Sequence, residues 1–221
     1  MPSNEPSRDC PLCPRLAAFR DALRAQHPTW HNAPVPGFGP ATARLLILGL
    51  APGLKGANRT GRPFTGDFAG DLLFATLQKF GFATGTYIAG REDAAWVPDN
   101  VALVDARITN AVRCLPPANK PLPDEEKACR PFLAGEFSAM PKLKAILALG
   151  HLAHNAVLKT LALKASQAKF AHGALHELHG HDLPGGLILA DSYHCSRYNT
   201  NTGVLTPAMF EAVFAGLKAR L

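Results

Sequence analysis

The sequence predicts an open α/β/α sandwich in which helices cover both faces of a central four-stranded parallel sheet. Four short runs, residues 44–49, 101–109, 145–150 and 186–191, are nearly continuous in Val, Ile, Leu and Ala. Such runs are typical of strands that are buried on both faces. Helical patterns lie between them, and this alternation of strand and helix predicts a parallel sheet with helices on each side.

The helical segments carry start signals in the expected places. Asp124 and the two glutamates after it provide negative charge, which suits a helix N-terminus. Thr206 is an N-cap candidate, and Pro207 takes the first helical position of the last helix. The predicted helices cover residues 12–26, 69–80, 124–140, 151–161 and 207–221.

Length, composition and charge limit the class of protein. The 221 residues suit one domain, taken here as 1–221, and 47% of them are apolar, enough for a sizeable core. The longest apolar runs are far short of the ~20 residues of a membrane helix, and the polar start lacks a signal-peptide pattern. The net charge of +6 permits a polyanionic partner without requiring one. We therefore expect a soluble, cytoplasmic globule. The sequence carries no signal of oligomeric state, and we take a monomer as the default.

Function is expected in the loops that follow the strands, because ligands of such sheets bind beyond the carboxyl ends of the strands. These segments are 50–67, 110–121, 151–155 and 192–203. The first, second and fourth are rich in Gly, Pro, Asn and polar residues. The first is neither a P-loop nor a G-x-G-x-x-G motif.

Four of the five cysteines have a pattern that suits a metal centre. Cys10 and Cys13 form a C-x2-C pair, while Cys114 follows the second strand and Cys129 lies on the acidic helix. Four such thiolates can hold a [4Fe–4S] cluster or a structural zinc. Buried free thiols are the plain alternative, and a disulfide is not expected in a cytoplasmic chain. The loose spacing of the second pair favours iron and sulfur over zinc, with a structural role.

The strand-end motifs resemble those of one enzyme family. They include Gly49-Leu-Ala-Pro-Gly53, the run Asn-Arg-Thr-Gly-Arg-Pro-Phe-Thr-Gly-Asp over 58–67, Val-Arg-Cys-Leu-Pro-Pro over 112–117, and Ser-Tyr-His over 192–194. In type and order these motifs are similar to those of the iron–sulfur uracil-DNA glycosylases, and most to family 5, the type-B enzymes. Family 4 usually has a glutamate where Leu50 stands and a shorter His-Pro-Ser loop.

The resemblance implies a cofactor and an activity. It implies a [4Fe–4S] cluster on Cys10, Cys13, Cys114 and Cys129. It also implies removal of uracil, and in this family of other deaminated bases, from DNA. A base in a duplex must flip into a pocket before its glycosidic bond can be reached.

Catalytic roles follow from the same resemblance. Asp67 orients or deprotonates the attacking water, although it also suits a helix N-cap. His194 hydrogen-bonds the departing pyrimidine and stabilises its negative charge. Asn119 assists near the reaction centre, or is a plain turn residue.

The remaining expected contacts concern the base and the DNA backbone. Phe64 stacks on the flipped base, unless it only packs in the core. Asn110 departs from the small residue usual in family 5, and its amide matches the uracil edge, which predicts a narrower preference for uracil. Cys195 stands where proline is usual. Backbone groups of the first loop are expected at the base, and side chains of three loops at the DNA, with Tyr198 as a wedge or an exposed loop residue. These residues are Gly49, Ala51 and Gly53 for the base, and Arg59, Arg62, Lys120, Ser196, Arg197 and Tyr198 for the DNA.

Two other interpretations remain open. The chain could be a non-catalytic iron–sulfur protein that holds lesions without cutting them, since the same basic loops and aromatic ring would serve it. It could also be a family 4-like uracil glycosylase. A small electron-transfer protein does not explain the loops rich in Asn, Thr and Arg.

Overall fold

The main sheet is mostly parallel and has the strand order β4-β1-β5-β7-β6. The computed structural model describes residues 5–89, 98–179 and 186–221. β1, β4, β5 and β7 are parallel, and β6 pairs antiparallel with β7 at the edge. The bounds are β1 Leu45–Gly49, β4 Ala106–Asn110, β5 Ala145–Leu149, β6 Leu175–Leu178 and β7 Leu187–Ser192.

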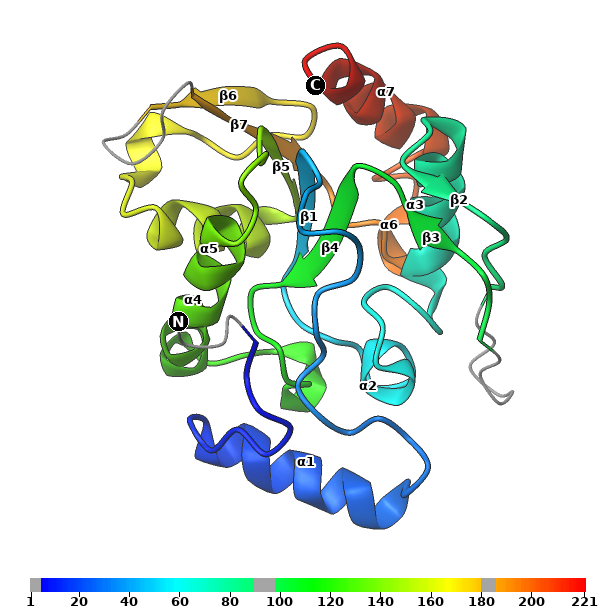
Figure 1. The fold of residues 1–221 in the computed structure, drawn as a ribbon, viewed down its shortest axis with the longest axis vertical. Coiled ribbons are helices and arrows are strands. Elements are labelled where there is room, and N and C mark those ends of the chain that lie inside the picture. The colour runs from blue at the N-terminus through cyan, green and yellow to red at the C-terminus, as the bar shows by residue number, and fades with distance from the viewer. Residues whose placement is uncertain (1–4, 90–97, 180–185) are drawn as a thin grey trace.

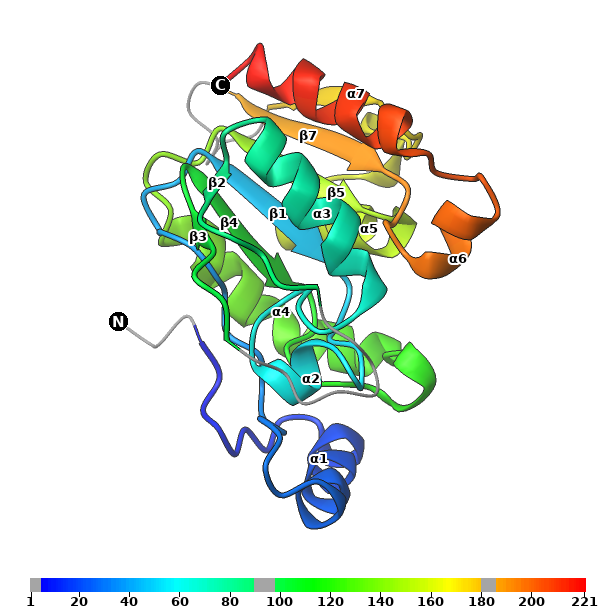
Figure 2. The same cartoon turned by 90° about the vertical axis from the view of Figure 1, so that its right-hand side faces the viewer.

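Helices cover both faces of this sheet, which confirms the predicted three-layer sandwich. Figure 2 shows α3 and α7 in front of the sheet, with α4 and α5 behind it. Alternate residues of β1 point to opposite layers, so Leu45 and Ile47 join the core under α3 and α7, and Leu46 and Leu48 the core under α4 and α5. The bounds are α3 Phe68–Lys79, α4 Pro123–Ser138, α5 His151–Thr160 and α7 Pro207–Lys218.

Two details of the predicted sheet were wrong. The described sheet has five strands rather than four, because the short β6 reads Leu-His-Glu-Leu and lacks the apolar run of a buried strand. The run 101–109 is divided, since Asp105 adopts a left-handed φ of 54° and ends extended structure there. The part before it forms β3, Ala102–Leu103, which pairs with β2, Ala83–Thr84, in a separate two-stranded sheet.

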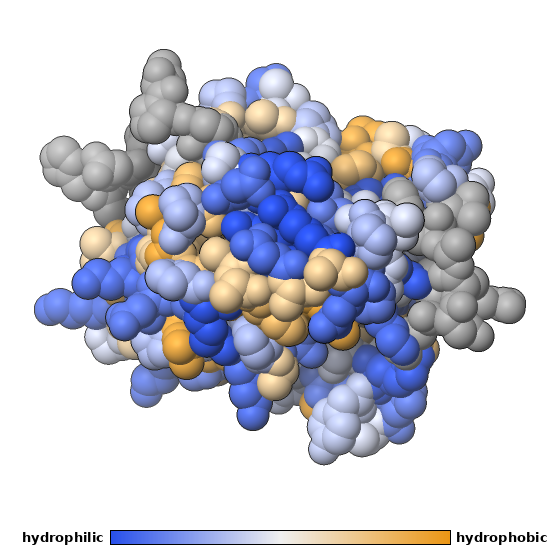
Figure 3. All heavy atoms as spheres, turned by 90° about the horizontal axis from the view of Figure 1, so that it is seen from below, coloured by the Kyte–Doolittle hydropathy of each residue, from blue (hydrophilic) through white to orange (hydrophobic). Residues whose placement is uncertain are grey.

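The N-terminal segment lies at the end of the molecule to which the arrowheads of β1 and β4 point (Figure 1). It contains α1, Pro14–Gln26, whose Leu16 packs against Val112 and Cys129. Arg15 of the same helix forms an ion pair with Glu125 of α4 at 2.7 Å. The face of the molecule seen from this end is mostly hydrophilic with a smaller group of apolar residues (Figure 3).

Two short helices, α2 Ala57–Thr60 and α6 Arg197–Asn201, lie near the same end of the sheet. The chain also has 3₁₀ turns at Pro117–Asn119 and Ala165–Gln167. None of the helices in the described ranges has both the length and the apolar character needed to cross a bilayer.

Candidate active site

A pocket of about 370 Å³ opens beyond the carboxyl ends of β1, β4 and β7, where the fold class predicts a ligand. We call it the strand-end pocket. Seven of the residues expected at the base or the reaction centre line it together. They are Ala51, Gly53, Phe64, Asp67, Asn110, Asn119 and His194.

The floor of the pocket depends on a close approach at Gly49. Gly49 and Asn110 are register partners at the ends of β1 and β4. A Cβ at Gly49 would stand 2.4 Å from Asn110 Oδ1 and 2.8 Å from the Phe64 ring. Only glycine therefore allows the buried amide of Asn110 and the phenyl ring to lie this close. Gly49 shapes the pocket from beneath rather than lining it.

Phe64 is held in a strained conformation at the pocket wall. Its φ of 53° lies in the left-handed region, which is an outlier for a bulky side chain and costs about 1–3 kcal/mol. The ring lies 5.8 Å from the His194 ring, centroid to centroid, with 28° between the planes. Phe64 also belongs to the core cluster under α3. It therefore both packs in the core and presents a ring to the pocket.

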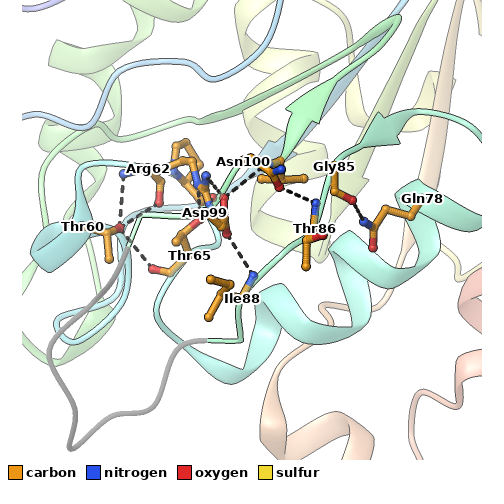
Figure 4. Close-up of polar contacts among 11 residues, drawn as sticks. Thr60, Arg62, Thr65, Gln78, Gly85, Thr86, Ile88, Asp99 and Asn100 are labelled. Atoms are coloured by element: carbon orange, nitrogen blue, oxygen red, sulfur yellow. Dashed lines mark hydrogen bonds and ion pairs between the residues drawn. The ribbon is translucent and has the colours of Figure 1, made fainter.

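A polar network fixes the loop that carries Phe64 (Figure 4). The Arg62 guanidinium donates two hydrogen bonds of 2.7 Å to the fully buried carboxylate of Asp99 and a third of 2.7 Å to Thr65 Oγ1. It also lies over the Phe38 ring. Burial works to raise the pKa of Asp99, but hydrogen bonds from Arg62 and from the Ile88 N–H outweigh it and hold that pKa below its usual range. Arg62 thus serves an interior ion pair and keeps 13% of its side-chain surface exposed, and its contact with a DNA phosphate stays a prediction.

Asp67 occupies the N-cap position immediately before α3, but its side chain does not cap the helix. Its backbone has the extended conformation of an N-cap, yet its carboxylate makes no side-chain capping hydrogen bond. The carboxylate lines the pocket instead. It packs on the loop after β1, since a Cβ at Gly56 would stand 2.2 Å and one at Gly53 3.2 Å from Asp67 Oδ2. The carboxylate is thereby placed at the pocket by backbone that only glycine permits.

His194 follows β7 and faces Phe64 across the pocket. Its backbone carbonyl accepts a 2.8 Å hydrogen bond from Asn199 Nδ2, which holds the turn after the strand. Desolvation lowers the pKa of His194 to about 4, so its imidazole is neutral near pH 7. The next residue, Cys195, is fully buried in the core, where burial raises its thiol pKa. Cys195 is therefore a packing residue and is closed to solvent.

The rim of the pocket carries polar and cationic groups. Asn119 is exposed and has a φ of 55°, a conformation that asparagine tolerates well, so it is both a turn residue and a lining residue. Arg197 lines the pocket with its guanidinium 5.3 Å from the centroid of the Phe68 ring. Ser196 Oγ caps α6 by accepting from the Asn199 N–H. Tyr198, beside them, is 73% exposed.

The two other predicted DNA contacts lie further from the centre of the pocket. Arg59 Nη2 donates to the Gly66 carbonyl at 3.2 Å and so braces the turn before Asp67. Lys120 is exposed beside Asn119, and its carbonyl accepts from Arg15 of α1.

Sequence reasoning missed the residues that support Phe64 from behind. A Cβ at Gly70 would stand 2.1 Å from the Phe64 carbonyl oxygen and 2.3 Å from the Tyr87 hydroxyl. Burial raises the pKa of the neighbouring Asp71, and the hydroxyl of Tyr87 acts against that rise. A glycine inside a helical pattern signals close approach of another segment and could have been noticed. Nothing in the sequence points to Tyr87.

A second cavity brings together the four cysteines expected to share a metal centre. Cys10, Cys13, Cys114 and Cys129 line it, and we call it the cysteine cavity. All five cysteines of the chain are free. Burial, and after it the charges of neighbouring thiols, raises the pKa of Cys13 to about 11 and that of Cys114 to about 12.

A backbone donor and a buried cation flank this cavity. The Arg113 N–H donates to Cys129 Sγ at 3.3 Å. The Arg113 side chain is fully buried and pairs with Glu136 at 2.5 Å. Four converging thiols with a backbone donor are suited to a thiolate-bound metal cluster, because thiolates are the ligands of such groups.

Comparison with known proteins finds one family over most of the chain. The model of the Uracil DNA glycosylase superfamily matches residues 36–218. A type-5 uracil-DNA glycosylase of Thermus thermophilus is 42% identical over 95% of this chain and 92% of its own length. The type-5 enzyme of Mycobacterium bovis is 39% identical over 95% of this chain and 77% of its own length. A type-4 uracil-DNA glycosylase of Pyrobaculum aerophilum is 31% identical over 65% of this chain and 62% of its own length.

Proposed function

Because the chain belongs to the uracil-DNA glycosylase superfamily, we propose that the strand-end pocket receives a uracil flipped out of DNA and that its side chains break the glycosidic bond. The chain is a uracil-DNA glycosylase, a hydrolase that removes uracil from DNA in repair. The observation that supports this use of the pocket is the meeting of Phe64, Asp67, Asn110 and His194 around one cavity.

Phe64 and Asn110 recognise the flipped base in this proposal. The Phe64 ring offers a face on which a pyrimidine stacks, and its strained backbone holds that ring in place before the base arrives. The amide of Asn110 presents one donor and one acceptor together, the complement of uracil O4 and N3–H. We therefore infer a narrower preference for uracil than for other deaminated bases.

Asp67 acts on the water that attacks the sugar. Departure of the base leaves an oxocarbenium-like sugar, which a nearby carboxylate stabilises while it orients the water toward C1′. The contacts of Asp67 with Gly53 and Gly56 fix its carboxylate at the pocket. Asn119, at the rim, hydrogen-bonds the same water or the sugar.

His194 stabilises the departing base as a neutral imidazole. A pKa of about 4 leaves one ring N–H as a hydrogen-bond donor at neutral pH. This donor meets the negative charge that develops on the pyrimidine oxygen, and it does not transfer a proton to it. A donor that is already in position gains more in the transition state than in the ground state, which is what raises the rate.

We also propose that the cysteine cavity holds a [4Fe–4S] cluster on Cys10, Cys13, Cys114 and Cys129. The four thiols come from a local C-x2-C pair and from two separate segments, and this arrangement favours an iron–sulfur cluster over zinc. Its contribution is structural, because it ties the N-terminal segment to α4 and to the segment after β4.

DNA containing uracil is the proposed partner, bound across the rim of the pocket. Arg59, Lys120 and Arg197 contact phosphates, contacts that add affinity without specificity. Ser196 lies beside Arg197, and the exposed ring of Tyr198 enters the space that the flipped base leaves. We propose that residues 1–221 act as a single domain and a monomer. The free cysteines fit a reducing compartment such as the cytoplasm.

The test is a glycosylase assay on a labelled duplex with one U·G mismatch, followed by alkali. DNA treated with wild type should be cleaved at the uracil site, and Asp67→Ala should lower the single-turnover rate by about 10²–10⁴-fold. Asp21→Asn, which changes an exposed carboxylate on α1 away from the pocket, is the matched control and should stay within about 3-fold of wild type.

Three results would contradict parts of the proposal. Cleavage that survives Asp67→Ala would remove Asp67 from water activation. Binding of damaged DNA without any cleavage would favour a lesion-binding protein. Equal release of hypoxanthine and uracil by wild type would contradict the role of Asn110.

A further inference from the structure

Three residues outside both cavities converge at the edge of the sheet. His154 of α5, His176 of β6 and Asp191 of β7 each place a ligand atom within 4.8 Å of the other two. His154 Nδ1 lies 2.7 Å from Asp191 Oδ1, and His176 Nε2 lies 3.3 Å from Asp191 Oδ2. Each oxygen of the carboxylate therefore faces one imidazole.

Both ring nitrogens of His154 face oxygen atoms that act as hydrogen-bond acceptors. His154 Nε2 lies 3.1 Å from the Ala168 carbonyl oxygen, which can only accept, so this nitrogen carries a hydrogen. Nδ1 faces a carboxylate oxygen, which is also an acceptor when ionised. A neutral imidazole has a single N–H, so either Nδ1 and the carboxylate share a proton at this 2.7 Å distance or both bind one metal cation.

The carboxylate of Asp191 is buried and therefore needs a compensating positive charge. The side chain of Asp191 is fully buried and that of His154 nearly so. Within the described ranges, the ion-pair partners of Asp191 are these two histidines. A buried carboxylate without a compensating cation is costly. Desolvation accordingly raises the pKa of Asp191, against the opposing effect of the two imidazoles.

The donor set and its surroundings match those of transition-metal sites. Two imidazole nitrogens and one carboxylate are ligands for zinc and for the neighbouring divalent metals. Metal-binding histidines usually donate their other N–H to a backbone carbonyl, as His154 does to Ala168. The side chain of His176 keeps 20% of its surface exposed, which leaves a path for an ion and a position for water.

We propose that His154, His176 and Asp191 form a binding site for a divalent transition-metal cation of the zinc class, separate from the cysteine cavity. The cation cross-links α5, β6 and β7. Asp191 is three residues before His194, so the ion also stiffens the strand end from which the pocket histidine projects.

The test is calorimetric titration of chelator-treated, iron-loaded protein with Zn²⁺, with iron content measured before and after. We expect one zinc per chain, no loss of iron and a higher melting temperature. His176→Ala should weaken the affinity by at least about 100-fold, since it removes a ligand rather than an outer contact. His179→Ala, an exposed histidine three residues further on, is the matched control and should bind as wild type does.

Two results would overturn the proposal. The first is zinc affinity in His176→Ala equal to that of wild type, or no binding in either, which would leave a proton between His154 and Asp191. The second is zinc uptake accompanied by an equal loss of iron, which would place the ion in the cysteine cavity. His176→Ala is preferred to an Asp191 variant because His176 lies partly at the surface and its loss leaves the core intact.

Discussion

The strand-end pocket and the cysteine cavity are neighbours along the chain but are built in different ways. β4 ends at Asn110 in the pocket, and the segment that follows it supplies Cys114 to the cavity. The pocket depends on backbone that approaches closely at Gly49 and Gly56 and on the strained φ of Phe64. The cavity depends on side chains from three segments that are remote in sequence. Side-chain changes in the pocket should therefore alter chemistry, and those in the cavity should alter stability.

The largest expected effect is on stability, at the cysteine cavity. Cys129→Ser should lose bound iron and lower the free energy of unfolding by at least about 3 kcal/mol, because the binding energy of a structural metal group is folding energy. Iron analysis and thermal melting measure this. Cys195→Ala, a buried thiol outside the cavity, is the control and should keep its iron. An iron-free Cys129→Ser with the wild-type melting temperature would remove the structural role of the cluster.

The next largest effect is on rate, in the pocket. His194→Ala removes the proposed donor to the departing base and should lower the single-turnover rate about 10²–10³-fold. Its melting temperature should stay within a few degrees of that of wild type, because His194 packs on the pocket rather than in the core. His151→Ala, an exposed histidine on α5, should leave the rate unchanged. A large fall in melting temperature for His194→Ala would break the contrast between the two sites.

The ion pair between Arg62 and Asp99 should affect both the stability of the protein and the rate of the reaction. Asp99→Asn breaks the interior pair with Arg62 and should cost about 3 kcal/mol of stability while loosening the loop of Phe64 and slowing the reaction. Asp9→Asn removes an exposed pair with Arg24 and should leave the stability close to that of wild type. Chemical denaturation with single-turnover rates measures both. An unchanged rate in Asp99→Asn would mean that the loop holds without this pair.

The same pair has a defined pH dependence. The folded-state pKa of Asp99 lies below the unfolded value of 3.8, so its stabilisation is present above pH 3.8 and is lost as pH falls through the folded value. The stability difference between wild type and Asp99→Asn should therefore disappear in strong acid.

The smallest effect concerns the pH profile of the reaction. The pKa of His194 is about 4, so its ionisation should leave no inflection near 6.5 in the rate. The neutral form is favoured on folding, so His194 lowers the free energy of unfolding as pH falls from about 6.5 to about 4. Rates of wild type and His194→Asn across pH 5–8 test this. An inflection near 6.5 in wild type that is absent from His194→Asn would contradict it.

Local features of the structure could be predicted from the sequence, but contacts between residues far apart in the chain could not. The buried runs of β1 and β5 and the loop from Leu50 to Asp67 were readable, because apolar runs and clustered Gly and Pro have direct structural causes. The pairing of Arg62 with Asp99, 37 residues away, could not be predicted, because the sequence does not show which side chains become neighbours in the fold.

The same limit applies to conformation and to edges. The left-handed backbone of Phe64 has no sequence signature, because a bulky residue rarely adopts it. β6 was not predicted, because it is a strand through its pairing with β7 rather than through its own composition. The partnership of His154, His176 and Asp191 likewise appears only when three elements are folded together.

The most direct test of this division is the single-turnover rate of uracil release per folded molecule, measured side by side in Asp67→Asn and Cys129→Ser. Asp67→Asn should fall about 10²–10⁴-fold at an unchanged melting temperature. Cys129→Ser should have a much lower melting temperature. At a low temperature at which it is folded, its rate per folded molecule should stay within about 10-fold of that of wild type. A rate in folded Cys129→Ser as low as that of Asp67→Asn would contradict the account, because it would place the cysteine cavity within the chemistry.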